Sequence, residues 1–344
     1  MTASARRRRG PTAPCHSDAV TALPPLAAGS VSLRLYPHAG LDATATVTEM
    51  LAQGRLAAEA GFDGVMTSEH HGGFAGYLPN PLQMAGWLLD TMPRGWAAPC
   101  PLLLTLRPTA LVAEEVAWLA ARYPDRVGLG IAAGSLADDF EIMGVSYDDR
   151  ATRFTEALVQ LAGLLGGGAQ GRLADDPALA RCRTHPVPMV SAAMSAVAVR
   201  RAARHGLGLL FDSLSSVSRV RELVDVYRHA GGGAACVLIR RVWVGEPPSQ
   251  ALKRQVDVYR TYAAAGAQSY WTADEAVVGD TADQVAEQVT ALLAVTGADA
   301  LNLRVHAPGI DASQVRAQIE ALAAVVTRCG AAGQARQRSG RPPL

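Results

Sequence analysis

The segment whose side chains are best suited to proton transfer is Ser68-Glu69-His70-His71, which directly follows the apolar run 64–67. A carboxyl group and two imidazoles therefore stand where a short buried strand ends. Histidine changes charge near neutral pH, and a neighbouring carboxylate can orient it for proton transfer. We predict that His70 is catalytic and that Glu69 and His71 support it.

A metal site is the first alternative for these residues. Neighbouring residues of an extended strand point to opposite faces, so His70 and His71 do not easily ligate one ion. The spacing His-x-His, which would turn two imidazoles to the same face, is absent from the chain. We therefore expect no metal. A histidine that is only hydrogen-bonded at the rim of the fold is the other alternative to a catalytic one.

Short apolar runs alternate with helical patterns from residue 30 onward, as in repeated strand–helix units around a parallel sheet. Eight such runs occur, and eight parallel strands close a barrel. The runs are 31–36, 64–67, 102–106, 127–131, 187–191, 207–211, 236–244 and 300–305. We predict a (β/α)8 TIM barrel with an insertion before the last strand, over 245–279.

A doubly wound open sheet uses the same units. It would usually place G-x-G-x-x-G after its first strand, where this chain has Tyr36-Pro37-His38-Ala39-Gly40. Gly128-Leu129-Gly130 does occur, but inside the fourth predicted strand, so it is a weak signal.

In a barrel, the residues that follow the strands converge on one mouth, where active sites lie. Polar and glycine residues stand at these strand ends, and we expect them to line the site: 68–71, Thr105, Arg107, Gly134, Ser135, Ser191, Ser195, Asp212, Ser213, Arg240, Arg241, Arg304 and His306.

Composition limits the classes of protein. A net charge of +1 lacks the positive excess of a nucleic-acid binder, so we expect no nucleic-acid partner. No run of about 18 apolar residues is present, so we expect no membrane span. The five cysteines are scattered and form no Cys-x-x-Cys pair, which favours a reducing cytoplasm. Cys100 and Cys236 begin apolar runs and have no evident activating partner, so we expect small buried side chains there.

The ends of the chain differ from its middle. Residues 1–29 are rich in Ala, Pro and Thr and hold the run Arg6-Arg7-Arg8-Arg9. Paired arginines can open an export signal, but no long apolar segment follows before Pro24-Pro25. We predict a disordered extension over 1–29, one barrel domain over 30–328 and a disordered tail over 329–344.

Several motifs carry a resemblance to a known family. They are the segment 61–71, Asn80-Pro81, the segments 128–134, 139–145 and 147–150, and Gly279-Asp280-Thr281. In this order they resemble the luciferase-like monooxygenase family, and the segments 139–145 and 147–150 resemble the bacterial luciferase alpha subunit. The resemblance covers about residues 30–328. It implies an eight-stranded barrel that uses reduced FMN or, in other branches, the deazaflavin F420.

The resemblance implies roles for individual residues. His70 would lie at the reacting edge of the flavin, while Arg150 and Ser195 would hold the flavin phosphate; a solvated helix-start residue is the alternative for Arg150. We count Gly134, Thr105 and Arg107, at the same mouth, as further candidate cofactor-binding residues. The implied activity is a flavin-dependent monooxygenase that oxidises a small organic substrate with O2. A reductase would supply reduced flavin, and the protein would form a homodimer or a heterodimer with a related barrel.

The chain also departs from the family pattern. Ala132 and Ala133 stand where luciferase alpha has a reactive cysteine and a phosphate-binding arginine, and Ala198 replaces a threonine. The phosphate would then need Arg107, Arg200 or Arg201 as a substitute. These losses leave two alternatives, an F420-dependent hydride-transfer oxidoreductase and a non-catalytic flavin-binding partner subunit.

The insertion 245–279 is the last predicted feature. It holds Pro247-Pro248 and the aromatic residues Tyr259, Tyr262, Tyr270 and Trp271. Long loops after barrel strands commonly shape the substrate pocket. Packing of an added helix explains the same aromatic residues equally well.

Overall fold

A parallel sheet organises the computed structural model, which describes residues 22–74, 76–262, 268–269, 271 and 276–338. Hydrogen-bonded neighbours run in the order β3-β2-β1-β10-β8-β7-β6-β5-β4, and the paired strands are parallel. The strands are β1 (Val31–Arg34), β2 (Gly64–Thr67), β3 (Trp96–Pro99), β4 (Leu102–Leu103), β5 (Leu129–Ala132), β6 (Met189–Ala192), β7 (Gly208–Phe211), β8 (Cys236–Val244) and β10 (Ala300–Arg304). A parallel bridge from Ala97 to Val127 joins β3 to the residues before β5, so the sheet nearly closes into the predicted barrel.

The third barrel strand differs from the prediction over 102–106. Its first half is β3, which pairs with β2, and its second half is β4, which pairs with β5. The residues Leu104–Leu106 form a 3-10 helix, η1, instead of continuing the strand. Pro99 and Pro101 lack the N–H that a central strand donates, so the strand is split where they stand.

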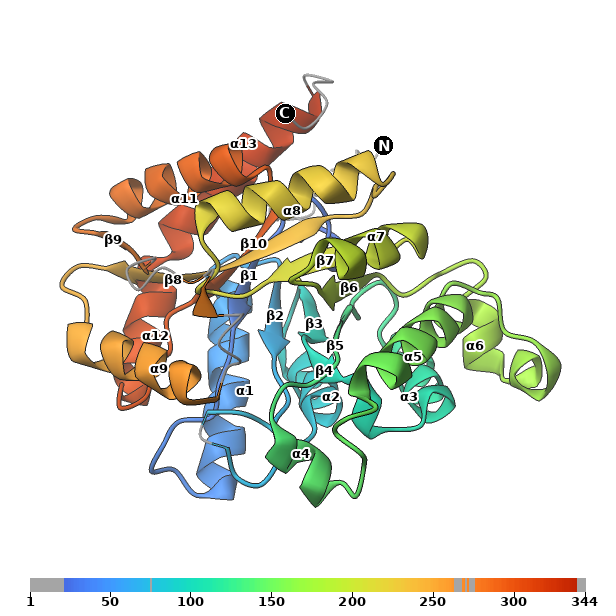
Figure 1. Cartoon of the computed structure of the whole chain (residues 1–344). Coiled ribbons are helices and arrows are strands. Elements are labelled where there is room, and N and C mark those ends of the chain that lie inside the picture. The colour runs from blue at the N-terminus through green and yellow to red at the C-terminus, as the bar shows by residue number, and fades with distance from the viewer. Residues whose placement is uncertain (1–21, 75, 263–267, 270, 272–275, 339–344) are drawn as a thin grey trace, which may run out of the picture.

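Helices cover the outside of the barrel (Figure 1). They are α1 (Ala43–Glu59), α2 (Pro81–Thr91), α3 (Thr109–Arg122), α4 (Ala137–Ile142), α5 (Arg150–Leu165), α6 (Pro177–Arg181), α7 (Ala196–Arg204), α8 (Val217–His229), α9 (Ser249–Tyr262), α11 (Ala282–Thr296), α12 (Ala312–Ala321) and α13 (Ala323–Arg338). Phe154, Leu158 and Leu161 lie on the buried face of α5, because residues three and four positions apart share one face of a helix. Thr281 caps α11 by accepting the N–H of Gln284, which satisfies one of the free donors of the first turn.

The interior of the barrel is apolar at one end and polar at the other. Leu26, Met66 and Trp96 belong to one buried apolar cluster. Its other members are side chains from further strands of the barrel. Further along β1 and β10, Arg34 is 2% exposed and donates to the amide oxygen of Asn302 at 2.7 Å. The polar end is therefore the end from which the strands lead into the loops of the mouth.

The chain ends are as follows. Residues 1–21 of the predicted extension lie outside the described residues, whereas 24–29 form turns that bring Leu26 into the apolar cluster. Two helices, α12 and α13, end the described chain, and α13 runs to Arg338 through the start of the predicted tail. In the described part of the chain, no helix is long and apolar enough to cross a membrane.

The insertion 245–279 contains α9 and a short strand, β9 (Ala276–Gly279), that pairs with the end of β8. Helices α4 and α9, which follow β5 and β8, lie at the bottom of Figure 1, while α8 and α13 lie at the top.

Candidate active site

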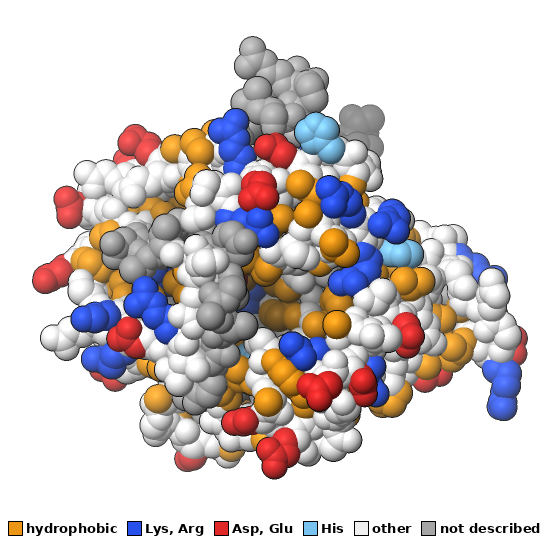
Figure 2. Space-filling view, in the orientation of Figure 1, with side chains coloured by type: hydrophobic (Ala, Val, Ile, Leu, Met, Phe, Trp, Pro, Cys, Tyr) orange, Lys and Arg blue, Asp and Glu red, His pale blue; other side chains and the backbone are white. Residues whose placement is uncertain are grey.

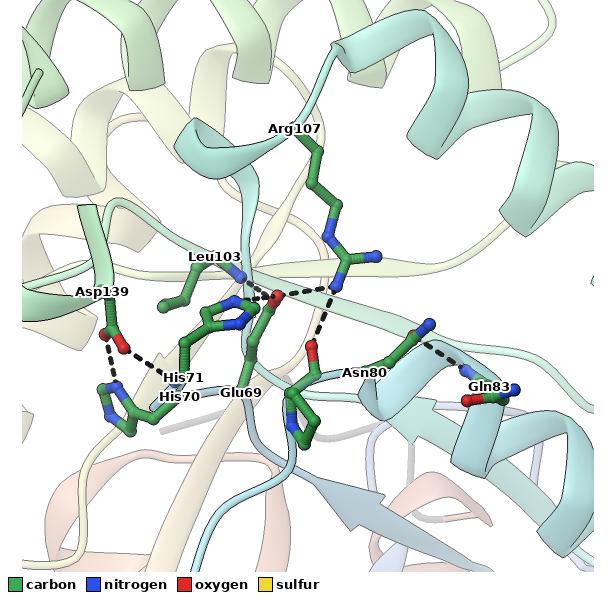
Figure 3. A network of polar contacts seen from close by, with 9 residues as sticks. Glu69, His70, His71, Asn80, Gln83, Leu103, Arg107 and Asp139 are labelled. Carbon is green, nitrogen blue, oxygen red and sulfur yellow. Dashed lines mark hydrogen bonds and ion pairs between the residues drawn. The ribbon is translucent and has the colours of Figure 1, made fainter. Parts of the chain in front are cut away.

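The backbone of the segment 68–71 continues the sheet beyond β2. The N–H of Glu69 donates to the carbonyl of Pro101 at 3.2 Å, and the N–H of His70 donates to the carbonyl of Leu78 at 3.1 Å. Glu69 therefore lies between the third strand and the returning loop before α2. Asn80 ends this loop, accepts the N–H of Gln83 at 3.1 Å and starts α2 (Figure 3).

Glu69 is a fully buried carboxylate with three donors. Its Oε1 accepts from Arg107 Nη2 at 2.7 Å and from His71 Nε2 at 3.1 Å, while Oε2 accepts the N–H of Leu103 at 2.6 Å (Figure 3). The side chain of Glu69 is 0% exposed. A buried carboxylate needs such partners, so Glu69 fixes the position of the loop and of Arg107.

His70 pairs with a carboxylate from another element. Its Nδ1 lies 2.7 Å from Oδ2 of Asp139 on α4, and the other oxygen of Asp139 accepts the N–H of His71 at 2.8 Å. Because an ionised carboxylate only accepts, Nδ1 carries the proton and Nε2 of neutral His70 is the free acceptor. Nε2 has no hydrogen-bond partner among the described residues.

Aromatic rings stand beside His70. Its ring centroid is 4.9 Å from that of Phe74 and 4.5 Å from that of Tyr77. The side chain of His70 is 17% exposed, so the imidazole is shielded but reachable. Figure 2 shows one face of the molecule, which is hollowed near its centre, with hydrophobic and charged side chains at the border of the hollow.

Thr105 and Arg107, predicted to bind the cofactor, are engaged with the protein itself. Thr105 Oγ1 donates to the carbonyl of Ala133 at 2.8 Å, which links η1 to the end of β5. Besides Glu69, Arg107 donates to the carbonyl of Pro79 at 3.2 Å. Both side chains therefore hold the loops of the mouth in place.

Gly134 follows β5 with a φ of +80°. A Cβ at this position would stand 2.9 Å from Cε2 of Phe140 on α4. Glycine is thus required both by the backbone conformation and by the close approach of Phe140. This turn leads from β5 to α4, and α4 carries Asp139.

Arg150 begins α5 and has no ion-pair partner among the described residues. Its Nη1 donates to the carbonyl of Tyr147 at 3.0 Å, and its guanidinium lies 3.8 Å from the centroid of the Tyr147 ring. One turn later, Arg153 donates to the carbonyl of Thr105 at 3.0 Å. The first turn of α5 contains no acidic residue. Two arginines at the positive end of a helix favour a bound anion there.

Ser195 starts α7 and is exposed. Its hydroxyl accepts the N–H of Ala198 at 3.3 Å, so it is a helix cap. No hydrogen bond of the described residues joins it to Arg150 or to His70, so these candidates share only the rim of the barrel.

The possible substitutes for the missing phosphate ligands differ in position. Arg201 on α7 donates to the hydroxyl of Thr155 on α5 and lies over Phe154, with 5.4 Å from its guanidinium to the ring centroid. Its Nε is buried without a partner. Arg200 instead lines a depression of about 510 Å³ with Glu222, Asp225 and His229. Of these two arginines, Arg201 is the one that contacts α5.

The four cysteines of the described residues are buried thiols. Burial raises the pKa of Cys100 to about 11 and that of Cys236 to about 12, so both stay protonated at neutral pH. In the described residues, no group of three or more His, Cys, Asp or Glu side chains could hold a metal ion.

Asp139 is the main residue that the sequence analysis did not single out. It stood inside the quoted segment 139–145, but nothing in its spacing indicated a contact with a histidine 69 positions away. Tyr259 was named with the insertion, and it reaches the mouth, where its hydroxyl lies 2.7 Å from that of Tyr77. Tyr270 and the side chain of Tyr262 lie outside the described residues.

With this geometry in view, comparison with known proteins identifies the family. A family model described as luciferase-like monooxygenase matches residues 30–329. The chain belongs to this family. Uncharacterised proteins of Mycobacterium tuberculosis and Mycobacterium bovis are 34% identical over 132 residues, which is 36% of this chain and 46% of theirs. The match thus spans slightly less than half the length of these curated relatives.

Solved structures of the luciferase-like fold resemble this member closely. A monooxygenase from Streptomyces bottropensis has a TM-score of 0.72 at 19% identity, over 87% of this chain and 98% of that one. The oxygenating constituent of 3,6-diketocamphane monooxygenase from Pseudomonas putida, solved with FMN, has a TM-score of 0.70 at 17% identity, with the same coverage. An F420-dependent secondary alcohol dehydrogenase has a TM-score of 0.63 at 16% identity, again with the same coverage. At these identities the likeness concerns the fold.

Proposed function

We propose that this protein is a flavin-dependent monooxygenase that uses reduced FMN and O2 to oxidise a small organic substrate. The observation that carries the proposal is the pairing of His70 with Asp139 at the mouth of a luciferase-like barrel. In this proposal a separate reductase supplies the reduced flavin. The protein works in the cytoplasm as a homodimer or as a heterodimer with a related barrel.

The residues at the start of α5 fit a flavin phosphate. Arg150 and Arg153 bind only carbonyl oxygens and a tyrosine ring, so their charge is available to an anion. The N-terminal N–H groups of α7, capped by Ser195, offer further donors. Arg201, which contacts α5 through Thr155, adds a further positive charge on the neighbouring helix. This set can supply charge in place of the arginine that the family pattern has at Ala133.

When bound, reduced FMN supplies the electron pair that activates O2. His70 handles the proton. Asp139 keeps the proton on Nδ1, so Nε2 can accept a proton from the substrate and return it. Phe74 and Tyr77 limit the access of water to the imidazole. Glu69 and Arg107 hold the loop that carries His70, and they do so without facing the reactants.

A titration under anaerobic conditions tests this function. The protein is mixed separately with reduced FMN and with reduced F420, and quenching of fluorescence is followed. Saturable binding of FMN, followed by substrate-dependent uptake of O2 that His70→Ala abolishes, supports the proposal. A preference for F420 with turnover in the absence of O2 replaces it with hydride transfer. Binding without turnover of any substrate identifies a non-catalytic partner subunit.

A further inference from the structure

A second polar cluster lies at the ends of β1 and β10, on the other side of Tyr77 from His70. Its centre is Arg304, the last residue of β10, which is 5% exposed. The Nε of Arg304 donates to the carbonyl of His306 at 3.1 Å, and Nη1 donates to the hydroxyl of Tyr259 at 2.5 Å. Its guanidinium lies 4.1 Å from the centroid of the Tyr36 ring. These partners are neutral groups.

The positive charge of Arg304 has no carboxylate partner among the described residues. Its second terminal nitrogen, Nη2, makes no hydrogen bond with them. Arg34, which is also buried, donates to the neutral side chains of Asn302 and Ser68. A buried cation without an anion is costly, and proteins normally pair it. Among the described residues, Arg304 and Arg34 are therefore two buried positive charges with no carboxylate partner at this end of the barrel.

The protein groups around Arg304 offer one internal anion at most. Burial raises the pKa of Tyr77 and of Tyr259, so both stay neutral. Burial and Arg304 lower the pKa of His306 to about 3, so it is neutral as well. Burial opposes the ionisation of Tyr36, but Arg304 and Arg34 lower the pKa of its hydroxyl below the ordinary value. The field of the two arginines thus favours negative charge at Tyr36 or beside it.

The cluster is connected to the proposed catalytic histidine through a single ring. The centroid of Tyr77 is 5.3 Å from that of Tyr36 and 4.5 Å from that of His70. On the far side, the rings of Tyr36 and His306 stack with centroids 5.2 Å apart. These rings pack against one another and do not form an open slot. The unbonded Nη2 of Arg304 suits an anionic oxygen, and the aromatic rings beside it suit a ligand that carries a ring.

We propose that Arg304 binds an anionic oxygen of the substrate, a carboxylate or an ionised phenol on an aromatic ring. This deepens, and rests on, the proposed function, since it places the opposite end of the substrate at His70. Tyr36 and Tyr259 position the guanidinium, and Tyr77 lies between the two ends. The substrate class is therefore aromatic acids and phenols.

Binding of two probes of one shape tests the subsite without any flavin. Benzoate and benzamide are titrated into the full chain by calorimetry, and only benzoate is charged. We expect benzoate to bind at least tenfold tighter than benzamide, and R304Q to remove this preference. A third probe, 4-nitrophenolate, is compared with benzoate. Tighter binding of 4-nitrophenolate assigns the subsite to phenols, and weaker binding assigns it to carboxylates.

Matched variants exclude an indirect effect. R260Q removes an exposed arginine of α9 that pairs only loosely with Asp257, at 4.0 Å, and it should keep the preference for benzoate. R304K retains the charge without the planar fork and should keep part of the preference. The proposal is overturned if the parent protein binds benzoate and benzamide equally, or if R304Q keeps the preference for benzoate. Either result leaves ionised Tyr36 as the counter-charge of Arg304.

Failure of the subsite and failure of the proposed function give different results. If R304Q loses selection for benzoate while the parent protein binds no reduced FMN, the anion subsite stands and the monooxygenase does not. If reduced FMN binds and O2 is consumed with a neutral substrate while benzoate shows no preference, the monooxygenase stands and the subsite is wrong. Circular dichroism and the melting temperature of R304Q verify folding, and Y36F, which keeps Arg304, provides a second test of the preference if R304Q does not fold.

Discussion

One carboxylate fixes two consecutive residues of the mouth: Asp139 accepts from Nδ1 of His70 at 2.7 Å and from the N–H of His71 at 2.8 Å. Each oxygen of the carboxylate accepts one of these hydrogen bonds. The orientation of the carboxylate therefore fixes both the ring of His70 and the backbone at His71. Since Asp139 belongs to α4 and His70 follows β2, the pair also joins the second and fourth loops of the barrel.

Asp139→Asn tests the role of this pair. The amide keeps the size of the side chain but no longer stabilises a proton on Nδ1, so we expect turnover to fall by about 100-fold, as for loss of a proton-transfer group. Binding of reduced flavin should change little. Asp138→Asn, at the exposed neighbour on α4, is the control and should retain full activity. Full activity of Asp139→Asn would remove the pair from the mechanism.

Glu69→Gln should destabilise the fold. The substitution leaves Arg107, whose side chain is 14% exposed, without its anion. Breaking a buried ion pair costs about 3–5 kcal/mol, and we expect about 3 because Arg107 keeps some contact with water. Urea denaturation measures the change. Glu59→Gln removes one partner of an exposed pair with Arg55 and should have little measurable effect; equal losses in both variants would contradict the role of Glu69.

Gly134→Ala should disturb the turn that leads to Asp139. An alanine at positive φ costs about 1 kcal/mol or more, and its Cβ would approach Phe140 to 2.9 Å. We expect lower stability and weaker binding of reduced flavin in the same variant. The control is Gly163→Ala within α5, where a Cβ meets nothing within 4 Å. It should gain about 0.5–1 kcal/mol. If Gly134→Ala changed neither the stability nor the binding of reduced flavin, the turn would relax freely around the added Cβ.

Arg150→Gln should weaken binding of reduced FMN. A hydrogen bond between charged groups contributes about 1.5–3 kcal/mol, so we expect a loss of roughly tenfold to 150-fold in affinity. Fluorescence titration gives the dissociation constant. Arg200→Gln, at the exposed arginine of the depression beside α8, should leave the constant unchanged. A stronger effect at Arg200 would move the phosphate site to that depression.

His306 should make the fold sensitive to acid. Its pKa is lowered to about 3 by burial and by Arg304, whereas an unfolded histidine titrates near 6.5. Between pH 3 and pH 6.5, His306 binds a proton in the unfolded chain but not in the folded chain. The free energy of unfolding therefore falls as the pH falls from 6.5 toward 3. The slope from one such group reaches about 1.4 kcal/mol per pH unit.

The variant His306→Phe removes this proton and keeps a flat ring against Tyr36. Urea denaturation between pH 4 and 7 should therefore show a shallower loss than in the parent protein. Asp63 and Asp299 have raised pKa values because of burial, and the difference between the two proteins cancels their contribution. His205→Gln, at an exposed residue after α7, should keep the parent slope. Identical slopes for parent and His306→Phe would show that His306 titrates normally.

Local sequence signals predicted most of the strands. The run Gly64–Thr67 is β2 with the predicted bounds, because β-branched and apolar residues between turn residues leave few alternatives. The strand Trp96–Pro99 was not predicted, since alanine and proline are poor strand formers and only pairing with β2 stabilises it. The family and the barrel were predicted by the motifs and confirmed by the comparisons and the sheet.

Partners that are distant in the sequence could not be predicted. Arg107 was named as a possible phosphate ligand because it follows a strand, but folding brings it onto Glu69. The unpaired positive charge of Arg304 likewise depends on which carboxylates the fold places at a distance from it. Spacing along the chain contains no information on either relationship, because both arise from the closure of the barrel.

The apolar cluster of Leu26, Met66 and Trp96 fills the interior of the barrel with side chains from several strands. The barrel is thus a packed core and not a channel, so ligands can reach only the residues at its mouth.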